Sequence, residues 1–408
     1  MYSPMKAASM AGRWSCVLAT LLLSFVTEKT TWRAEGKTVP PGLFVFGDSI
    51  LDVGNNNFLT RTTAKANFPP NGMDFPGGKP TGRFSNGYNA ADYLAQQYGF
   101  DASPPAFFSL SQSQLRTSIC KGINFASGGS GILASTGTSL VSTHRSLPFR
   151  SFSSLSLITQ TNKDALYNPA MHASTMQGGA ISMDAQLDNF KNSLKSFSAG
   201  RCSATKGDFL SKSIFLLSAG SNDLFGLYRS NSTTTQTSEF ITSLASKYGT
   251  QLTTLYGYGA RRFGILGLSL IGCCPSFRRL NTTGDCIAAL DDYALQFNKA
   301  LSKVLKQFVS AHAGVKYSVG DGLSIGKLIA DNPLKYGFKE FKSACCGSGK
   351  FNGESACTQN ATLCSDRDDH FFWDFFHPTA STAKLQVRLL FGSSPSVANP
   401  INFGGLVG

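Results

Sequence analysis

The stretch from Leu43 to Asn57, LFVFGDSILDVGNNN, decides the fold of this 408-residue chain. Its first four residues are apolar, aromatic or β-branched, which predicts a buried strand. The strand ends at Gly47, because glycine permits a sharp turn, and this leaves Ser49 at its carboxyl end. In open α/β sheets ligands bind at this edge, where a serine hydroxyl can face both a cleft and a base. A serine that only caps the following turn is the alternative.

Four further segments have the composition of buried strands, and amphipathic helical patterns separate them. This alternation predicts parallel strands joined by right-handed crossovers in one α/β domain over residues 37–408. The predicted strands are 43–46, 122–126, 214–219, 263–270 and 316–320, and the predicted helices are 90–98, 183–197, 239–258, 287–311 and 379–391.

A second polar cluster lies near the end of the chain, in the aromatic segment FFWDFFHP at residues 371–378. Asp374 and His377 are three residues apart there, a spacing that lets the carboxylate reach the imidazole. A serine hydroxyl becomes a good nucleophile when a neutral histidine accepts its proton and a carboxylate orients that histidine. We therefore predict a catalytic triad of Ser49, His377 and Asp374.

The tetrahedral intermediate of such a reaction needs hydrogen-bond donors aimed at its oxyanion. The candidate donors are the backbone N–H groups of Ser49 and Gly128 and the side-chain amide of Asn222. Asn55 and Arg83 are candidate substrate contacts, although turn formation explains them as well.

Two other patterns resemble known binding or catalytic motifs. The Gly-x-Gly-x-x-Ala pattern at 129–134 is not followed by a strand with a terminal acidic residue at the right distance, so no dinucleotide cofactor is predicted. The segment 322–326, GLSIG, matches the nucleophile elbow of α/β-hydrolases and makes Ser324 a rival nucleophile for the same histidine. That rival would leave the Ser49 and Asn222 clusters unexplained.

The amino terminus predicts export. Lys6 and Arg13 precede an apolar run at 16–26 that is too short to span a bilayer, so residues 1–36 are expected to hold a signal peptide with an uncertain cleavage site. An uncleaved anchor is the alternative. No other apolar run is long enough to span a membrane. Asn231, Asn281 and Asn360 begin Asn-x-Ser/Thr glycosylation sequences that fit a secreted, extracellular or cell-wall location.

The ten cysteines fit the same compartment. Cys16 lies in the predicted signal peptide, and the remaining nine are an odd number, so at least one is free or intermolecular. We expect mostly local disulfides, and no metal site is predicted because adjacent Cys-Cys pairs lack zinc-site spacing. The expected pairs join Cys273 or Cys274 to Cys286, and Cys345 and Cys346 to Cys357 and Cys364.

The formal net charge of +13 comes from scattered Lys and Arg residues. No basic stripe with interleaved aromatic residues is present, so no nucleic-acid partner is predicted. Association with an acidic extracellular polysaccharide is the simpler interpretation of the charge.

Seven blocks of the sequence resemble the plant-type secreted GDSL esterase/lipase family of the SGNH-hydrolase superfamily, in the expected order over nearly all of the chain. They are 44–57 (FVFGDSILDVGNNN), 80–87 (PTGRFSNG), 123–133 (INFASGGSGIL), 218–223 (SAGSND), 268–275, 345–349 (CCGSG) and 372–379 (FWDFFHPT).

The resemblance implies a three-layer α/β/α sandwich of the flavodoxin-like type around a parallel five-stranded sheet. It also implies hydrolysis of carboxylic esters without a metal or cofactor. Ser49 would be the nucleophile and first oxyanion donor, Gly128 and Asn222 the other donors, Asp374 the orienting acid and His377 the base. Lipid, cutin-like and acylated-polysaccharide esters all remain open as substrates. An acyltransferase with the same triad, or a secreted wall- or glycan-binding protein with little turnover, is the alternative.

The chain departs from the family pattern at three places. Ile50 replaces the leucine of the eponymous motif, and Ala380 stands where the family usually has glutamate. The Ser/Thr-rich segment 138–177 has no counterpart in the pattern, and we interpret it as a lineage-specific surface loop or a retained intron.

Overall fold

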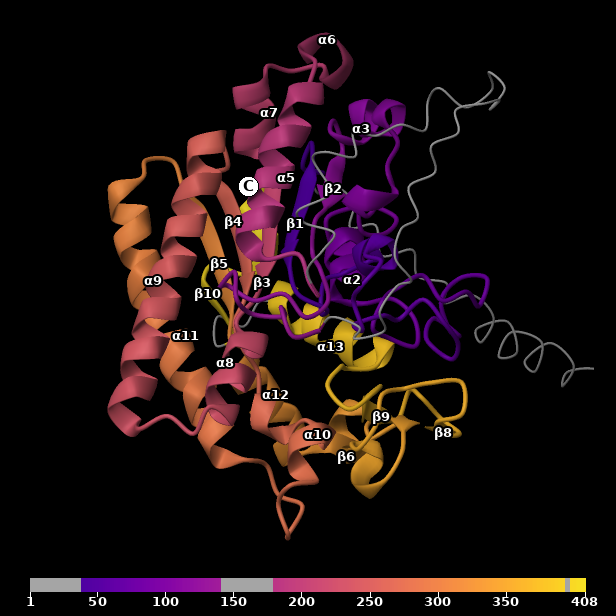
Figure 1. Ribbon diagram of the computed structural model, residues 1–408. Helices are drawn as coiled ribbons and strands as arrows, with labels where there is room; N and C mark the ends of the chain where they lie inside the picture. The colour runs from indigo at the N-terminus through magenta and orange to yellow at the C-terminus, as the bar shows by residue number, and fades with distance from the viewer. Residues whose placement is uncertain (1–37, 141–178, 393–396) are drawn as a thin grey trace, which may run out of the picture. The chain divides into compact units, whose positions relative to one another are not determined.

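The structure is a computed structural model that describes residues 38–140, 179–392 and 397–408. The predicted signal peptide and residues 141–177 of the Ser/Thr-rich segment lie outside the described residues. The described part is a mixed α/β fold whose central sheet has six strands in the order β10-β5-β4-β3-β1-β2 (Figure 1). Eleven α-helices accompany this sheet in the described ranges.

The five predicted strands are present and pair in parallel. They are β1 (Leu43–Gly47), β2 (Gly122–Asn124), β3 (Ile214–Ser218), β4 (Arg262–Leu266) and β5 (Lys316–Gly320). The expectation of a five-stranded, wholly parallel sheet is nevertheless wrong, because β10 (Ala398–Pro400) adds a sixth, antiparallel strand beside β5. A three-residue strand that ends in proline has no detectable periodicity, and proline is tolerated there because β10 is at the edge of the sheet.

Aromatic residues at matching register positions cover one face of the sheet. Phe44 pairs in register with Phe215, and Phe215 with Phe263, so the three rings lie on the same face. Phe190 packs against the first two rings and Phe308 against the third. These partners belong to α5 (Met183–Ser193) and α11 (Ala288–Ala311), so both helices bury their apolar sides on this face.

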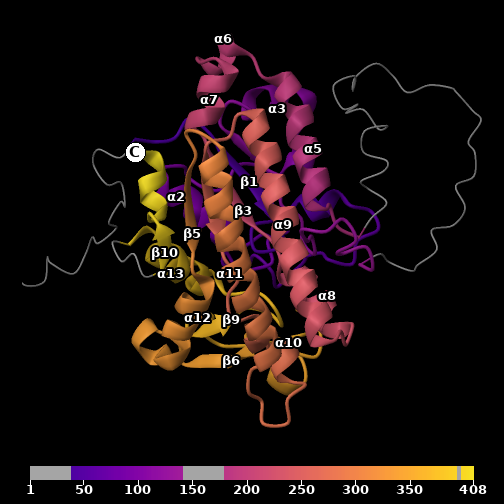
Figure 2. The ribbon, with the colours of Figure 1, turned by 90° about the vertical axis from the view of Figure 1, so that its left-hand side faces the viewer.

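The opposite face is covered by the first and last helices of the domain. Figure 2 shows α2 (Ala90–Gln97) and α13 (Ala380–Phe391) on the other side of the strands from α5 and α9 (Thr234–Tyr258). Phe403, in the 3-10 turn at Phe403–Val407, approaches Gly264 on this face and packs near Phe391 of α13. The sheet is therefore buried on both sides, as its nearly continuous apolar strands indicate.

Helix ends follow capping residues more closely than apolar periodicity. The long helix predicted from residue 239 begins at Thr234, because Thr233 and Gln236 form a capping box. At the other end of the chain Thr379 caps α13 through the Thr382 N–H, so Ala380, which departs from the family pattern, leaves this cap intact. The other α-helices are α3 (Gln112–Ser118), α6 (Ala199–Cys202), α7 (Lys206–Lys212), α8 (Ser221–Arg229), α10 (Pro275–Arg278) and α12 (Gly322–Asp331).

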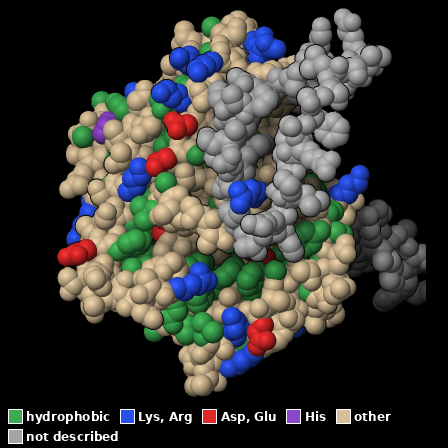
Figure 3. All heavy atoms as spheres, viewed as in Figure 1, with side chains coloured by type: hydrophobic (Ala, Val, Ile, Leu, Met, Phe, Trp, Pro, Cys, Tyr) green, Lys and Arg blue, Asp and Glu red, His purple; other side chains and the backbone are tan. Residues whose placement is uncertain are grey.

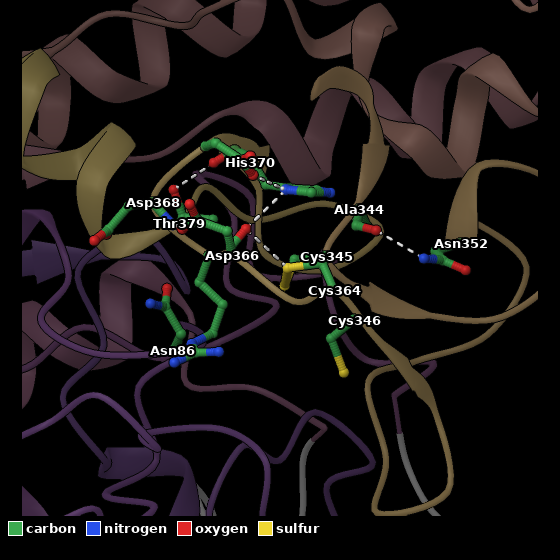
Figure 4. Close-up of a disulfide and its surroundings, with 12 residues drawn as sticks. Asn86, Ala344, Cys345, Cys346, Asn352, Cys364, Asp366, Asp368, His370 and Thr379 are labelled. Atoms are coloured by element: carbon green, nitrogen blue, oxygen red, sulfur yellow. Dashed lines mark hydrogen bonds and ion pairs between the residues drawn. A yellow bond between two sulfur atoms is a disulfide. The ribbon is translucent and has the colours of Figure 1, made fainter. Parts of the chain in front are cut away.

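The segment that precedes α13 contains two short strand pairs and two disulfides. In this segment β6 (Glu340–Ala344) pairs in parallel with β9 (His370–Phe372), and β7 (Cys346–Gly347) pairs with β8 (Thr362–Leu363). Disulfides join Cys345 to Cys364 and Cys346 to Cys357, as the sequence allowed. Figure 4 shows the Cys345–Cys364 bridge beside the loop that carries Asp366, Asp368 and His370.

Two more disulfides lie elsewhere in the fold. Cys273, and not its neighbour Cys274, pairs with Cys286, and Cys120 pairs with the distant Cys202. Cys274 is the one free cysteine in the described part of the chain, and it is buried. Among the helices that the structure describes, none combines the length and the apolar character needed to cross a bilayer.

Candidate active site

The structure brings Ser49, His377 and Asp374 together. His377 Nε2 lies 2.7 Å from Ser49 Oγ, and His377 Nδ1 lies 2.8 Å from both carboxylate oxygens of Asp374. Asp374 and His377 are buried, whereas Ser49 is half-buried. The arrangement suits proton transfer, because a carboxylate on Nδ1 leaves Nε2 as the acceptor for the serine proton.

Ser49 is positioned by the end of β1. Gly47 has a φ of 137°, and a Cβ there would lie 2.0 Å from the Ser218 carbonyl oxygen of β3, so only glycine fits this turn. The Asp48 N–H continues the sheet by donating to the same carbonyl at 3.0 Å. Ser49 therefore leaves the sheet at the carboxyl edge of its central strands, as the sequence predicted.

Asp374 and His377 lie in one tight turn between β9 and α13. The Trp373 N–H donates to the His377 carbonyl at 2.7 Å, and Asp374 Oδ1 accepts from the His377 N–H at 2.8 Å. The indole of Trp373, which is fully buried, donates to Asn71 at 2.9 Å. The Phe84 ring packs on the imidazole with 4.9 Å between centroids. The turn thus holds acid and base in a fixed relation before any substrate binds.

Two of the three groups predicted to bind the oxyanion, the Ser49 N–H and the Asn222 amide, have a hydrogen free to donate. The Ser49 N–H has no partner among the described residues. Asn222, the second residue of α8, donates one amide hydrogen to the Ser130 carbonyl at 2.9 Å, which leaves its second hydrogen available. Both residues line the cleft that contains the Ser49 hydroxyl.

Gly128, the third predicted donor, is engaged elsewhere. Its N–H donates to Asp52 Oδ2 at 2.9 Å inside the protein. The next residue, Gly129, lines the cleft, has a φ of 82°, and its N–H has no partner in the described ranges. The geometry therefore favours Gly129 over Gly128, a one-residue difference that motif spacing could not resolve because both glycines are adjacent.

Sequence reasoning missed two buried carboxylates that hold the loops around the site. Asp52 accepts from the N–H groups of Gly54, Asn55 and Gly128 at 2.8–2.9 Å, and burial raises its pKa to about 6 although these hydrogen bonds lower it. Asp223 accepts from the N–H groups of Ile132 and Leu133, and burial raises its pKa too. The signal was present, since both acids lie in the quoted blocks beside Ser49 and Asn222.

Asp48 is a third acid in the site, next to the nucleophile. It is buried, and one oxygen accepts from the Ile50 N–H at 3.0 Å. Burial is the main reason why the pKa of Asp48 rises to about 7, and the nearby His377 opposes the rise.

A cleft of about 390 Å³ opens over these residues, a volume within the range of small-molecule pockets. Ser49, His377, Asn222 and Gly129 line it. The cleft extends from the loop at residues 63–66 to the carboxyl ends of β4 and β5. Its walls are mostly apolar.

Comparison with known proteins agrees with this geometry. The family model GDSL-like Lipase/Acylhydrolase matches residues 43–390. Three GDSL esterase/lipases of Arabidopsis thaliana are 36%, 32% and 31% identical to this chain over 396, 396 and 409 residues, which cover 95–96% of this chain and 95% of each relative. The chain belongs to the GDSL esterase/lipase family. It is accordingly a carboxylic ester hydrolase.

In this GDSL family member, Asn55 and Arg83 do not line the cleft. The Arg83 guanidinium is buried and binds both oxygens of Asp92 at 2.7 and 2.8 Å. Asn55 is fully buried and donates to the carbonyls of Asn124 and Ala126. The prediction of substrate contacts is therefore corrected to the structural alternative, because all the polar groups involved are used within the fold.

The rival nucleophile Ser324 is not paired with the histidine of this hydrolase. Its hydroxyl donates to Asp321 at 2.6 Å at the exposed start of α12, and its N–H donates to the same carboxylate. Ser324 is exposed and does not line the cleft. The GLSIG segment is thus the first turn of α12, and Asp321 caps it.

The remaining predicted positions are peripheral. Asn231 and Asn360 are exposed and Asn281 is half-buried, and their glycosylation stays a prediction. The only group of metal-ligating side chains that converges in the described residues is Cys273, Cys286 and Asp291. Its two sulfurs form a disulfide, so they are not available as thiolate ligands.

Proposed function

We propose that this GDSL family member is a secreted serine esterase, a single hydrolase domain over residues 37–408, that works through an acyl-enzyme on Ser49. The observation that carries the proposal is the continuous hydrogen-bonded chain from Ser49 Oγ through His377 to Asp374. The four disulfides support an oxidising compartment, which agrees with the predicted signal peptide.

The reaction follows from the positions of these groups. Ser49 Oγ attacks the ester carbonyl carbon while its proton passes to His377 Nε2. The carbonyl oxygen becomes an oxyanion that accepts hydrogen bonds from the Ser49 N–H, the Gly129 N–H and the Asn222 amide. The alcohol leaves with the proton from His377. Water then attacks the acyl-enzyme, giving its proton to His377, and the acid leaves as Ser49 regains its proton.

Asp374 orients the imidazole and stabilises the imidazolium that forms in each half of the reaction. It is well suited to this role, because it also accepts the Phe376 and His377 N–H groups and so cannot rotate away.

Labelling with a fluorophosphonate and hydrolysis of p-nitrophenyl esters test the proposal together. Ser49→Ala should abolish labelling and lower kcat by about 10⁶-fold. Ser324→Ala is the matched control, since it removes the same hydroxyl from the rival motif, and it should label and turn over like the wild-type protein. Labelling that survives in Ser49→Ala and is lost in Ser324→Ala would overturn the assignment.

A further inference from the structure

The cleft continues well beyond the reacting groups, along the carboxyl edge of the sheet. Ser49 follows β1, Asn222 follows β3, Leu268 follows β4 and Gly322 follows β5, and all four residues line the cleft. Because neighbouring strands are about 4.8 Å apart, the three strand spacings from β1 to β5 correspond to about 14 Å. An acetyl group bound to Ser49 would leave most of this distance empty.

The far part of the cleft, which we call the apolar arm, is built from aliphatic side chains. They come from the end of β4 and the loop after it, from α12 and from α13: Leu266, Leu268, Leu270, Ile325, Val387 and Leu390. Phe371 and Phe372 of β9 line the same cleft. Figure 3 shows hydrophobic side chains gathered on the face around α8 and α13, where residues of both helices line the cleft.

Polar groups in the apolar arm are few and mostly used. The Ser269 hydroxyl donates to the Gly322 carbonyl at 3.0 Å. Among the described residues of the arm, Gln386 alone offers a polar side chain without a hydrogen-bond partner. A sugar placed there would leave most of its hydroxyls unpaired, at a cost for each one. Hydrocarbon loses nothing by entering such a site and gains from leaving water.

We propose that the apolar arm binds the acyl chain of a medium- to long-chain ester, so that the substrate is of the lipid or cutin type and not an acetylated polysaccharide. With C–C bonds of about 1.5 Å and a span of about 14 Å, an extended chain of on the order of ten carbons fills the arm. The inference rests on the proposed function, since it takes Ser49 as the site of the acyl-enzyme.

The test is a series of p-nitrophenyl esters from acetate to decanoate, used below their micelle concentrations and normalised by fluorophosphonate titration of active sites. For the wild-type protein kcat/KM should rise by at least about 100-fold from acetate to decanoate, since each buried methylene adds to binding. A wild-type protein that cleaves acetate at least as well as decanoate would overturn the proposal.

Two variants locate the effect in the arm. Val387→Phe, on α13, and Ile325→Phe, on α12, narrow the arm from different walls, and each should lower the decanoate-to-acetate ratio of kcat/KM by at least about tenfold. Leu385→Phe is the matched control, because Leu385 lies on α13 outside the cleft, and it should leave the ratio unchanged. An equal change of the ratio in the control, or no change in either arm variant, would contradict the proposal.

Failure of this inference is distinguishable from failure of the proposed function. A protein that is labelled at Ser49 and cleaves only acetate retains the esterase assignment and loses the acyl-chain arm. A folded protein with no labelling and no turnover of any ester loses both.

Discussion

The two halves of the active site are held in place by different means. Ser49 lies at the end of a fully buried strand, and hydrogen bonds to buried carboxylates and backbone groups shape the loops beside it. His377 lies in a turn between β9 and α13, and a disulfide-bonded segment supports that turn through backbone hydrogen bonds. The Cys345 N–H donates to the Phe372 carbonyl at 2.9 Å and the Cys346 N–H to the Trp373 carbonyl at 2.7 Å.

The central sheet therefore positions Ser49, whereas a buried cluster that contains two disulfides supports the turn with His377. A strand in the middle of a sheet cannot move without unfolding the domain. The turn that carries His377 lies outside the sheet, and its Trp373 packs against the cysteines of the two neighbouring disulfides. We expect substitutions around His377 to lower kcat more than they lower the free energy of unfolding. Substitutions around Ser49 should lower both.

The largest effect on kcat in this comparison is expected when Asp374, the carboxylate that contacts His377, is replaced. Asp374→Asn keeps the shape of the turn but presents an amide to Nδ1, which favours the wrong imidazole tautomer. We expect kcat to fall by about 10⁴-fold. The free energy of unfolding should fall too little to unfold a significant fraction of the protein. Steady-state kinetics and urea denaturation measure the two quantities. A loss of stability large enough to explain the lost activity would remove the contrast between the two halves.

Removal of one disulfide at a time is expected to have an intermediate effect on kcat, and it tests whether the disulfides near His377 position that residue. The double variant Cys346→Ala/Cys357→Ala opens a bridge of sequence separation 11 beside the catalytic turn, and Cys120→Ala/Cys202→Ala opens one of separation 82 that is not in the cleft. Chain entropy predicts losses of about 3 and 4–5 kcal/mol respectively. We nevertheless expect kcat to fall by about tenfold only in the first variant, measured at a temperature where both are folded. Equal kcat values in the two double variants would show that the Cys346–Cys357 disulfide has no part in positioning His377.

The smallest effect concerns the nucleophile side and its pH dependence. The pKa of Asp48 in the folded protein is about 7, above its ordinary value of 3.8, because burial penalises the charged form. Between these two values the folded state binds more protons than the unfolded state, so the free energy of unfolding should fall as pH rises from about 4 to 7.

We expect Asp48→Asn to flatten this pH dependence by on the order of 1–3 kcal/mol, because the amide cannot ionise and its oxygen still accepts the Ile50 N–H. Urea unfolding at pH 5 and pH 8 measures the change in the free energy of unfolding between the two pH values. Asp208→Asn, at an exposed carboxylate, is the control. A slope that persists unchanged in Asp48→Asn would assign the titration to Asp52 or Asp223 instead.

Much of the fold was predictable because it depends on local pattern. Five strands and the long helices have apolar runs or helical periodicity, and their positions hold to within a few residues. The edge strand β10 and the small ladders around the disulfides were not predictable. They are two to five residues long, and they exist because a neighbouring backbone offers hydrogen bonds, which no periodicity records.

The site divides in the same way. The three residues of the proposed triad, Ser49, Asp374 and His377, could be chosen from residue type and spacing, since Asp374 and His377 lie in one turn and Ser49 ends a strand. Arg83 was misassigned because a buried arginine paired with Asp92 has the same appearance in a sequence as one that faces a substrate. The choice between Gly128 and Gly129 depended on which N–H Asp52 accepts.

The sequence by itself determined the α/β class, the order of its parallel strands along the chain and the choice of Ser49, Asp374 and His377 as the proposed triad, because hydrophobic periodicity and short motifs carry that information locally. Only the tertiary structure decided that Cys273 and not Cys274 is bridged, which partners Cys345 and Cys346 take, which glycine N–H remains available, and that the cleft crosses the sheet edge from β1 to β5 as an apolar arm. Those features depend on distances between segments far apart in the chain, and such distances are set only when the core has packed.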